Sequence, residues 1–159
     1  KLLITSLNRV VDEYKLPIIV STHPRLRDKL QELRLEVKTG IKFCEPFGFF
    51  DYCKLQKEAK VVLSDSGSVS EESAILGFSA ITIRDSMERP EALEAGTISM
   101  SGLTPDGLIQ AITNAENVVR VPGLPTDYFI PNTSHRVVNF ISSTSTLHKF
   151  WNGVRNSVD

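Results

Sequence analysis

Residues 64–72 (SDSGSVSEE) combine the residue types that bind a phosphate group. A β-branched run precedes this segment and a helical pattern starts within it, so it is expected to be a strand-to-helix loop. Gly67 lets the backbone approach a ligand, and a helix N-terminus presents free N–H groups and a positive dipole end. The hydroxyls of Ser66 and Ser68 add donors. The pattern predicts a phosphate site, although helix capping by Asp65 or Ser66 explains the same residues.

The two carboxylates that close this segment are expected to differ in role. At about 100° per residue, Glu72 falls between Ile75 and Leu76, on a helix side expected to be partly buried. A carboxylate there can accept hydrogen bonds from two vicinal hydroxyls and so hold a nucleotide ribose. A favourable charge near the helix N-terminus is the alternative. Glu71 is expected to be solvated or to stabilise the helix dipole.

A second polar segment, residues 84–91 (RDSMERPE), follows the next apolar run. Arg89 precedes a proline, which favours an extended backbone, so its guanidinium can reach an anion with a bidentate fork. An ion pair with Glu88 or Asp85 is the alternative. His23, after an earlier apolar run, is a weaker candidate for binding an anionic substrate, since a single histidine is more often structural.

The elements that position these residues follow from the periodicity of the chain. Apolar runs predict strands, and three- and four-residue spacing predicts helices. The predicted strands are 18–21, 41–44, 61–64, 80–83 and 97–100, and the predicted helices are 2–14, 24–34, 51–59, 69–76, 88–95, 104–115, 134–141 and 146–155.

Strands that are continuous apolar runs separated by helices imply a parallel sheet with helices on both faces, which is a Rossmann-like α/β fold. Ligands bind such sheets beyond the carboxyl ends of the strands, where both polar segments lie. Residues 121–131 contain three prolines and are expected to be an extended connection. The apolar side chains of the last two helices predict packing, within this domain or on a further part of the polypeptide.

The composition bounds the function. A chain of 159 residues and 17.7 kDa is expected to be one domain, and 18 Lys and Arg against 19 Asp and Glu give a net charge of −1. No basic field attracts nucleic acid or an anionic membrane. Two cysteines without zinc-like spacing predict a reduced, cytoplasmic context and no metal. Because the chain opens at Lys1 inside a helical pattern that has no capping residue, it is expected to be a fragment of a longer polypeptide.

Residues 64–72, followed by 84–96 (RDSMERPEALEAG), resemble the carboxyl-terminal domain of the non-hydrolysing UDP-N-acetylglucosamine 2-epimerase family. The resemblance extends to residues 21–25 and 45–47. With the tail 127–132 (DYFIPN), it is greatest to the branch that makes UDP-N-acetyl-L-fucosamine for capsule or O-antigen from UDP-2-acetamido-2,6-dideoxy-L-talose. Ser68, in place of the family's frequent second glycine, agrees with that branch.

The resemblance implies a glycosyltransferase-B-like fold with the active site between two Rossmann-like halves. Residues 1–159 would be the carboxyl-terminal, UDP-binding half, ending in helices over 134–159, and the amino-terminal catalytic domain would lie outside this chain. Epimerisation in this family eliminates UDP to give a 2-acetamidoglycal and adds it back to the other face, without cofactor or metal. A homodimer is the implied assembly.

The resemblance also implies substrate-binding roles for six residues: Phe47, Ser66, Gly67, Ser68, Glu72 and Arg89. Phe47 would contact the uracil and Glu72 the ribose hydroxyls. The serines and the glycine would bind the diphosphate, and Arg89 the diphosphate or sugar, where it would stabilise the leaving UDP. No residue of this chain is implied to be the catalytic acid or base, so the chain alone is expected to be inactive.

Two other classes of function remain open. A glycosyltransferase of the same architecture would hold a nucleotide sugar in the same way and would release UDP only with an acceptor. A non-enzymatic α/β interaction domain would have no affinity for UDP.

Overall fold

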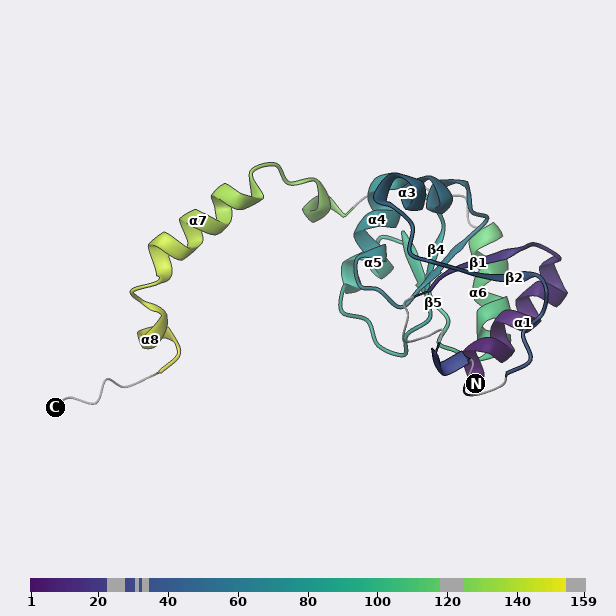
Figure 1. Cartoon of the computed structure of the whole chain (residues 1–159). Coiled ribbons are helices and arrows are strands. Elements are labelled where there is room, and N and C mark those ends of the chain that lie inside the picture. The colour runs from purple at the N-terminus through teal and green to yellow at the C-terminus, as the bar shows by residue number, and fades with distance from the viewer. Residues whose placement is uncertain (23–27, 31, 33–34, 118–124, 154–159) are drawn as a thin grey trace. The chain divides into compact units, whose positions relative to one another are not determined.

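A computed structural model describes residues 1–22, 28–30, 32, 35–117 and 125–153 (Figure 1). The chain forms two compact units, Lys1–Tyr128 and Phe129–Asp159. His23, most of the predicted helix 24–34 and residues 121–124 of the predicted connection lie outside the described residues. No helix within the described ranges has the length and apolar character needed to cross a membrane.

Within the described ranges, five short strands occupy the predicted apolar runs. They are β1 (Ile18–Ser21), β2 (Ile41–Cys44), β3 (Val62–Ser64), β4 (Ala80–Thr82) and β5 (Ile98–Met100). β1 pairs with β2, and β4 lies between β3 and β5; every one of these pairings is parallel. The parallel α/β class is therefore confirmed, and the last three strands are each one residue shorter than predicted.

The helices of the first unit alternate with these strands. They are α1 (Leu2–Tyr14), α3 (Phe49–Glu58), α4 (Val69–Leu76), α5 (Pro90–Glu94) and α6 (Pro105–Asn117). Gly77 ends α4 with a φ of 76°, a left-handed conformation that glycine adopts without strain. α5 begins at Pro90, because a proline fits the first helical position, where no N–H is needed.

The connection after α6 differs from its prediction. Residues 126–129, expected to be extended, form the short 3₁₀ helix η1 (Thr126–Phe129). In the second unit, α7 (Thr133–Thr144) begins one residue before its prediction and α8 (His148–Trp151) two residues after. α7 contains no buried residue, so the surface that its apolar side chains cover stays a prediction.

Helices cover both faces of the strands in the first unit (Figure 1). Ala80 and Ile81 are neighbours on β4 and point to opposite faces, because side chains alternate along a strand. One core joins α1, β4 and α6 through Val10, Ile81, Leu108, Ala111 and Ile112. The other joins α4, β4, α5 and β5 through Val69, Phe78, Ala80, Ala92 and Ile98.

The first helix is fastened to the last helix of its unit. Ser6, which is fully buried, donates a hydrogen bond of 2.5 Å to the carbonyl of Leu103, just before α6. Farther along α1, the hydroxyls of Tyr14 and Thr113 lie 3.1 Å apart. Residues about one hundred positions apart are thereby held together.

The strand register sets the position of both polar segments. Thr82, which ends β4, is paired with both Ser64, which ends β3, and Met100, which ends β5. The loop after β3 and the loop after β4 therefore leave the same edge of the sheet, as the sequence predicts.

Candidate functional site

The loop after β3 leads into α4 through Ser68, the N-cap residue, whose side chain makes no capping hydrogen bond. The hydroxyls of Ser66 and Ser68 instead lie 3.0 Å apart. The backbone N–H of Ser66 donates to the Ser64 hydroxyl at 3.0 Å, which tightens the turn. The two exposed serine hydroxyls and the α4 N-terminus are therefore together in one loop.

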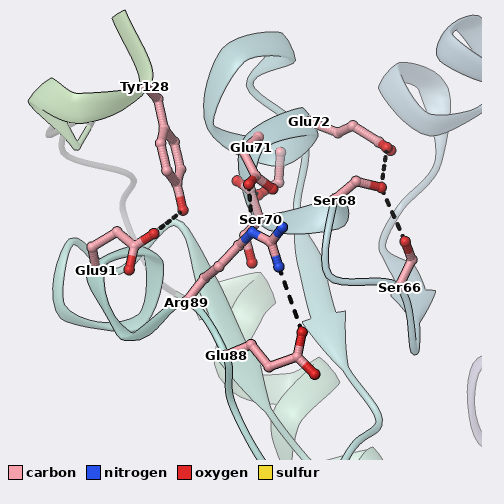
Figure 2. A network of polar contacts seen from close by, with 10 residues as sticks. Ser66, Ser68, Ser70, Glu71, Glu72, Glu88, Arg89, Glu91 and Tyr128 are labelled. Atoms are coloured by element: carbon pink, nitrogen blue, oxygen red, sulfur yellow. Dashed lines mark hydrogen bonds and ion pairs between the residues drawn. The ribbon is translucent and has the colours of Figure 1, made fainter. Parts of the chain in front are cut away.

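A chain of hydrogen bonds, the serine network, consists of Ser66, Ser68, Glu72 and Gln56. Ser68 donates to Oε1 of Glu72 at 2.7 Å, and Nε2 of Gln56 donates to Oε2 at 2.5 Å. Figure 2 shows the Glu72 carboxylate directed toward the two serines. Glu72 is partly buried as predicted, and both its carboxylate oxygens are fixed by neutral donors.

Sequence reasoning missed the contribution of α3 to this network. Gln56 is buried, and Tyr52, one helical turn before it, is partly buried. Burial raises the pKa of Tyr52, and the negative charge of Glu72 raises it further. The only sequence signal was the four-residue spacing of the two polar side chains, which surface helices commonly have.

A second chain of contacts, the arginine network, consists of Arg89, Glu71, Glu88 and Arg84. Nε of Arg89 donates to Oε1 of Glu71 at 2.5 Å, and Nη1 lies 3.8 Å from Oε2 of Glu88. Nη2 of Arg84 lies 2.7 Å from Oε1 of Glu88. The hydrogen bond to Glu71 raises the pKa of Arg89, which stays cationic.

Glu71 corrects the sequence prediction. It was expected to be solvated or to act on the helix dipole, but it is partly buried and holds Arg89 (Figure 2). Its Oε2 is buried and has no hydrogen-bond partner among the described residues. The alternative pairing of Arg89 with Glu88 is present, but as the longer of its two ion pairs.

Arg89 reaches the loop between β3 and α4, the serine loop. A Cβ placed on Gly67 would collide with Nη1 of Arg89, so glycine permits this close approach. Residues of the two loops, among them Ser66, Gly67, Arg84 and Arg89, line a shallow hollow that is open to solvent. Hydroxyls, a helix N-terminus and guanidinium groups therefore surround one space, a combination that binds anions.

Tyr128 lies beside the arginine network. Its hydroxyl donates to Oε1 of Glu91 at 3.0 Å, linking η1 to α5. Burial and, next, the hydrogen bond to Glu91 raise the pKa of Tyr128 to about 12. Tyr128 and Glu91 are drawn beside Arg89 in Figure 2.

The structure brings most of the predicted residues to one place. Ser66, Gly67, Ser68 and Arg89 surround the hollow or its loop, and Glu72 lies on the adjoining helix turn. Phe47 is partly buried in the loop between β2 and α3, also beyond the carboxyl end of a strand. His23 lies outside the described residues. Within the described ranges, no group of three or more His, Cys, Asp or Glu side chains is arranged to hold a metal ion.

The chain matches a known family model. The model described as UDP-N-acetylglucosamine 2-epimerase matches residues 1–142. Curated proteins named UDP-N-acetylglucosamine 2-epimerase from Methanococcus maripaludis and Methanocaldococcus jannaschii are 34% and 36% identical over 69% and 70% of this chain. The chain spans about a third of the length of these relatives, 31% and 32%.

Solved structures give the same result. A UDP-N-acetylglucosamine 2-epimerase from Rickettsia bellii is 36% identical and has a TM-score of 0.80, over 92% of this chain and 42% of that one. The Methanocaldococcus jannaschii enzyme in complex with UDP-GlcNAc and UDP is 32% identical with a TM-score of 0.77, over 89% of this chain and 40% of that one.

Proposed function

This chain belongs to the UDP-N-acetylglucosamine 2-epimerase family, and from that premise we propose that it is the carboxyl-terminal, UDP-binding domain of an epimerase acting on a UDP-N-acetylhexosamine. The hollow between the serine loop and Arg89 carries this proposal, because it gathers anion-binding groups at the carboxyl edge of the strands. The complex of the Methanocaldococcus jannaschii enzyme with UDP-GlcNAc and UDP supports the ligand class.

In the proposed complex, Ser66, Gly67 and Ser68 bind the diphosphate at the α4 N-terminus. Arg89 is held by Glu71 through Nε, which leaves its Nη groups to face the loop and donate to phosphate oxygens. Glu72 is the acceptor for the ribose hydroxyls. These groups occupy fixed positions before the ligand arrives, so they need little reorganisation.

The uracil is assigned to the β2–α3 loop. Phe47 is partly buried there, and an aromatic ring gives a nucleobase a flat apolar surface. With the diphosphate at the α4 N-terminus and the ribose at Glu72, the base would extend toward α3, whose Gln56 already contacts Glu72.

The reaction proposed for the whole enzyme is elimination of UDP followed by its re-addition on the other face of the sugar. Negative charge develops on the diphosphate as the C1–O bond breaks, and Arg89 and the α4 N-terminus stabilise that charge. The groups that remove and return the C2 proton are proposed to lie outside this chain. The 159-residue chain should therefore bind UDP without epimerising a UDP-sugar.

Calorimetric titration of the chain with UDP, UMP and uridine, without divalent metal, tests the UDP site. We expect affinity to fall with each phosphate removed, because the loop and Arg89 contact phosphate. Absence of UDP binding, or equal affinity for UDP and uridine, would overturn the proposal. A glycosyltransferase would instead require an acceptor for UDP release from a UDP-sugar by the whole enzyme.

The proposed substrate branch is the one that forms UDP-N-acetyl-L-fucosamine for capsule or O-antigen polysaccharide. Ser68, in place of a glycine, supports it. The test is turnover by an enzyme that includes this chain. Preference for UDP-2-acetamido-2,6-dideoxy-L-talose over UDP-N-acetylglucosamine is expected, and the reverse preference would overturn the branch but not the family.

A further inference from the structure

A buried amide, that of Gln56, lies against Glu72 and has no role in binding the proposed ligand. Of the ten residues of α3, all within the described ranges, Gln56 alone is buried, with 3% of its surface exposed. The buried face of a helix is normally apolar. A polar group at this position therefore needs an explanation.

Only one end of this amide is satisfied. Nε2 of Gln56 donates to Oε2 of Glu72 at 2.5 Å, whereas Oε1 of Gln56 has no hydrogen-bond partner among the described residues. A buried polar atom without a partner is unfavourable, and an apolar side chain of similar length would avoid this cost. What the amide provides in return is the hydrogen bond to Glu72.

That hydrogen bond determines which lone pairs of the carboxylate stay available. An ionised carboxylate offers about four acceptor positions on its two oxygens. Ser68 uses one position on Oε1 and Gln56 one on Oε2. Each oxygen retains an acceptor position, and the two donors together fix the plane of the carboxylate.

We propose that Gln56 is a positioning residue, which holds the Glu72 carboxylate so that one free acceptor on each oxygen faces the vicinal diol of a nucleotide ribose. This inference rests on the proposed function, because it assumes that Glu72 accepts from the ribose. Gln56 acts through Glu72 and is not assigned a contact with the ligand.

Tyr52, on the same face of α3 as Gln56, also senses the charge of Glu72. It is one turn from Gln56 and partly buried, and the charge of Glu72 contributes to its raised pKa. Gln56 makes the hydrogen bond from α3 to Glu72, and Tyr52 lies close enough for its pKa to depend on the same charge.

The experiment compares two ligands that differ only in the diol. UDP and 2′,3′-dideoxy-UDP are titrated into the native chain, Gln56→Met and the control Gln110→Met. Gln110 is an exposed glutamine on α6 that bonds Asn114. Gln56→Met should weaken UDP about tenfold and leave 2′,3′-dideoxy-UDP unchanged, because only the diol uses the oriented carboxylate. Gln110→Met should bind both ligands as the native chain does.

Each other outcome overturns a specific claim. If the native chain does not bind UDP, or binds both ligands equally, the proposed ribose site fails and the inference with it. If the native chain prefers UDP and Gln56→Met keeps the same preference, only the role of Gln56 fails. Equal weakening of both ligands would make Gln56 merely structural. Gln56→Asn, too short to reach Glu72, repeats the test if the methionine variant does not fold.

Discussion

The serine and arginine networks start from neighbouring residues of α4 and have opposite chemistry. The Glu72 carboxylate accepts hydrogen bonds from two neutral donors, Ser68 and Gln56, which orient it and leave its charge uncompensated. Glu71 forms an ion pair with the guanidinium of Arg89, which compensates the charge of Glu71 and holds the Arg89 side chain in place. One residue of helix, a rotation of about 100°, thus separates an acceptor from a group that supports a donor. A nucleotide, with hydroxyl donors at one end and phosphate acceptors at the other, fits this division.

The largest expected effect comes from exchanging the two carboxylates for amides. Glu72→Gln should weaken UDP by about 1.5 to 3 kcal/mol, because the ribose loses its charge-assisted hydrogen bonds. Glu71→Gln should weaken UDP less, since Gln can still accept from Nε of Arg89. Calorimetry on both variants provides the comparison. Equal losses of UDP affinity in the two variants would contradict the assignment of the ribose to the serine network and of the diphosphate to the arginine network.

Arg89→Lys tests the donor side alone. A lysine offers a point charge instead of a fork and cannot hold Glu71 and a diphosphate together. We expect UDP to bind about tenfold more weakly, which corresponds to about 1.4 kcal/mol, and uridine to be unaffected. The two titrations measure this directly. A matching loss of uridine affinity would show that Arg89 supports the whole site rather than the phosphates.

Gly67→Ala should have a smaller effect on binding and almost none on folding. The new methyl group would meet the end of the Arg89 side chain rather than backbone, so the loop backbone need not move. UDP affinity should fall several-fold. The free energy of unfolding, from thermal denaturation, should stay within about 0.5 kcal/mol of that of the native chain. A large loss of stability would instead indicate that the loop backbone cannot accept a Cβ.

A tyrosine with a raised pKa lies beside each network, Tyr52 beside the serine network and Tyr128 beside the arginine network. Their absorbance allows a spectroscopic comparison of the two networks. Glu72→Gln should lower the pKa of Tyr52, because it removes a charge that stabilises the neutral phenol. Tyr128 should keep its pKa of about 12 in that variant. Alkaline absorbance titration, with Tyr52→Phe to assign the signal, measures both. A shift of Tyr128 instead would contradict the separation of the networks.

Tyr128 also makes the stability of the folded chain depend on pH in the alkaline range. An unfolded tyrosine titrates near pH 10, whereas Tyr128 in the folded chain titrates at about 12. The folded state therefore gains stability that is fully present below about pH 10 and is lost as the pH rises through 12. As the pH rises through this range, the melting temperature of the native chain should fall relative to that of Tyr128→Phe.

In the first unit, the sequence predicted the described strands and α-helices to within about two residues, whereas η1 was expected to be extended. Apolar runs and helical spacing are local properties, and the stop signals at Gly77 and Pro90 are strong. α3 begins at Phe49, directly after its N-cap residue Gly48 and two residues before its prediction. Local rules were sufficient where backbone conformation decides the outcome.

The side-chain networks were only half predictable. The helical wheel placed Glu72 correctly on a partly buried side, but it treated Ile75 as a buried neighbour, and Ile75 is 54% exposed. Glu71 was assigned to solvent because its partner, Arg89, lies beyond the next strand. Gln56 comes from the preceding helix. Pairings across elements depend on how helices and loops meet in space, which spacing within one segment does not contain.

The hydrogen bond between Ser6 and Leu103 has a consequence for biosynthesis. α1 is translated before its partner α6, and the carbonyl that Ser6 bonds emerges about one hundred residues after Ser6. Contacts of such large sequence separation form slowly. The apolar face of α1 therefore stays exposed on the nascent chain until α6 has emerged. During that interval it is a binding site for chaperones.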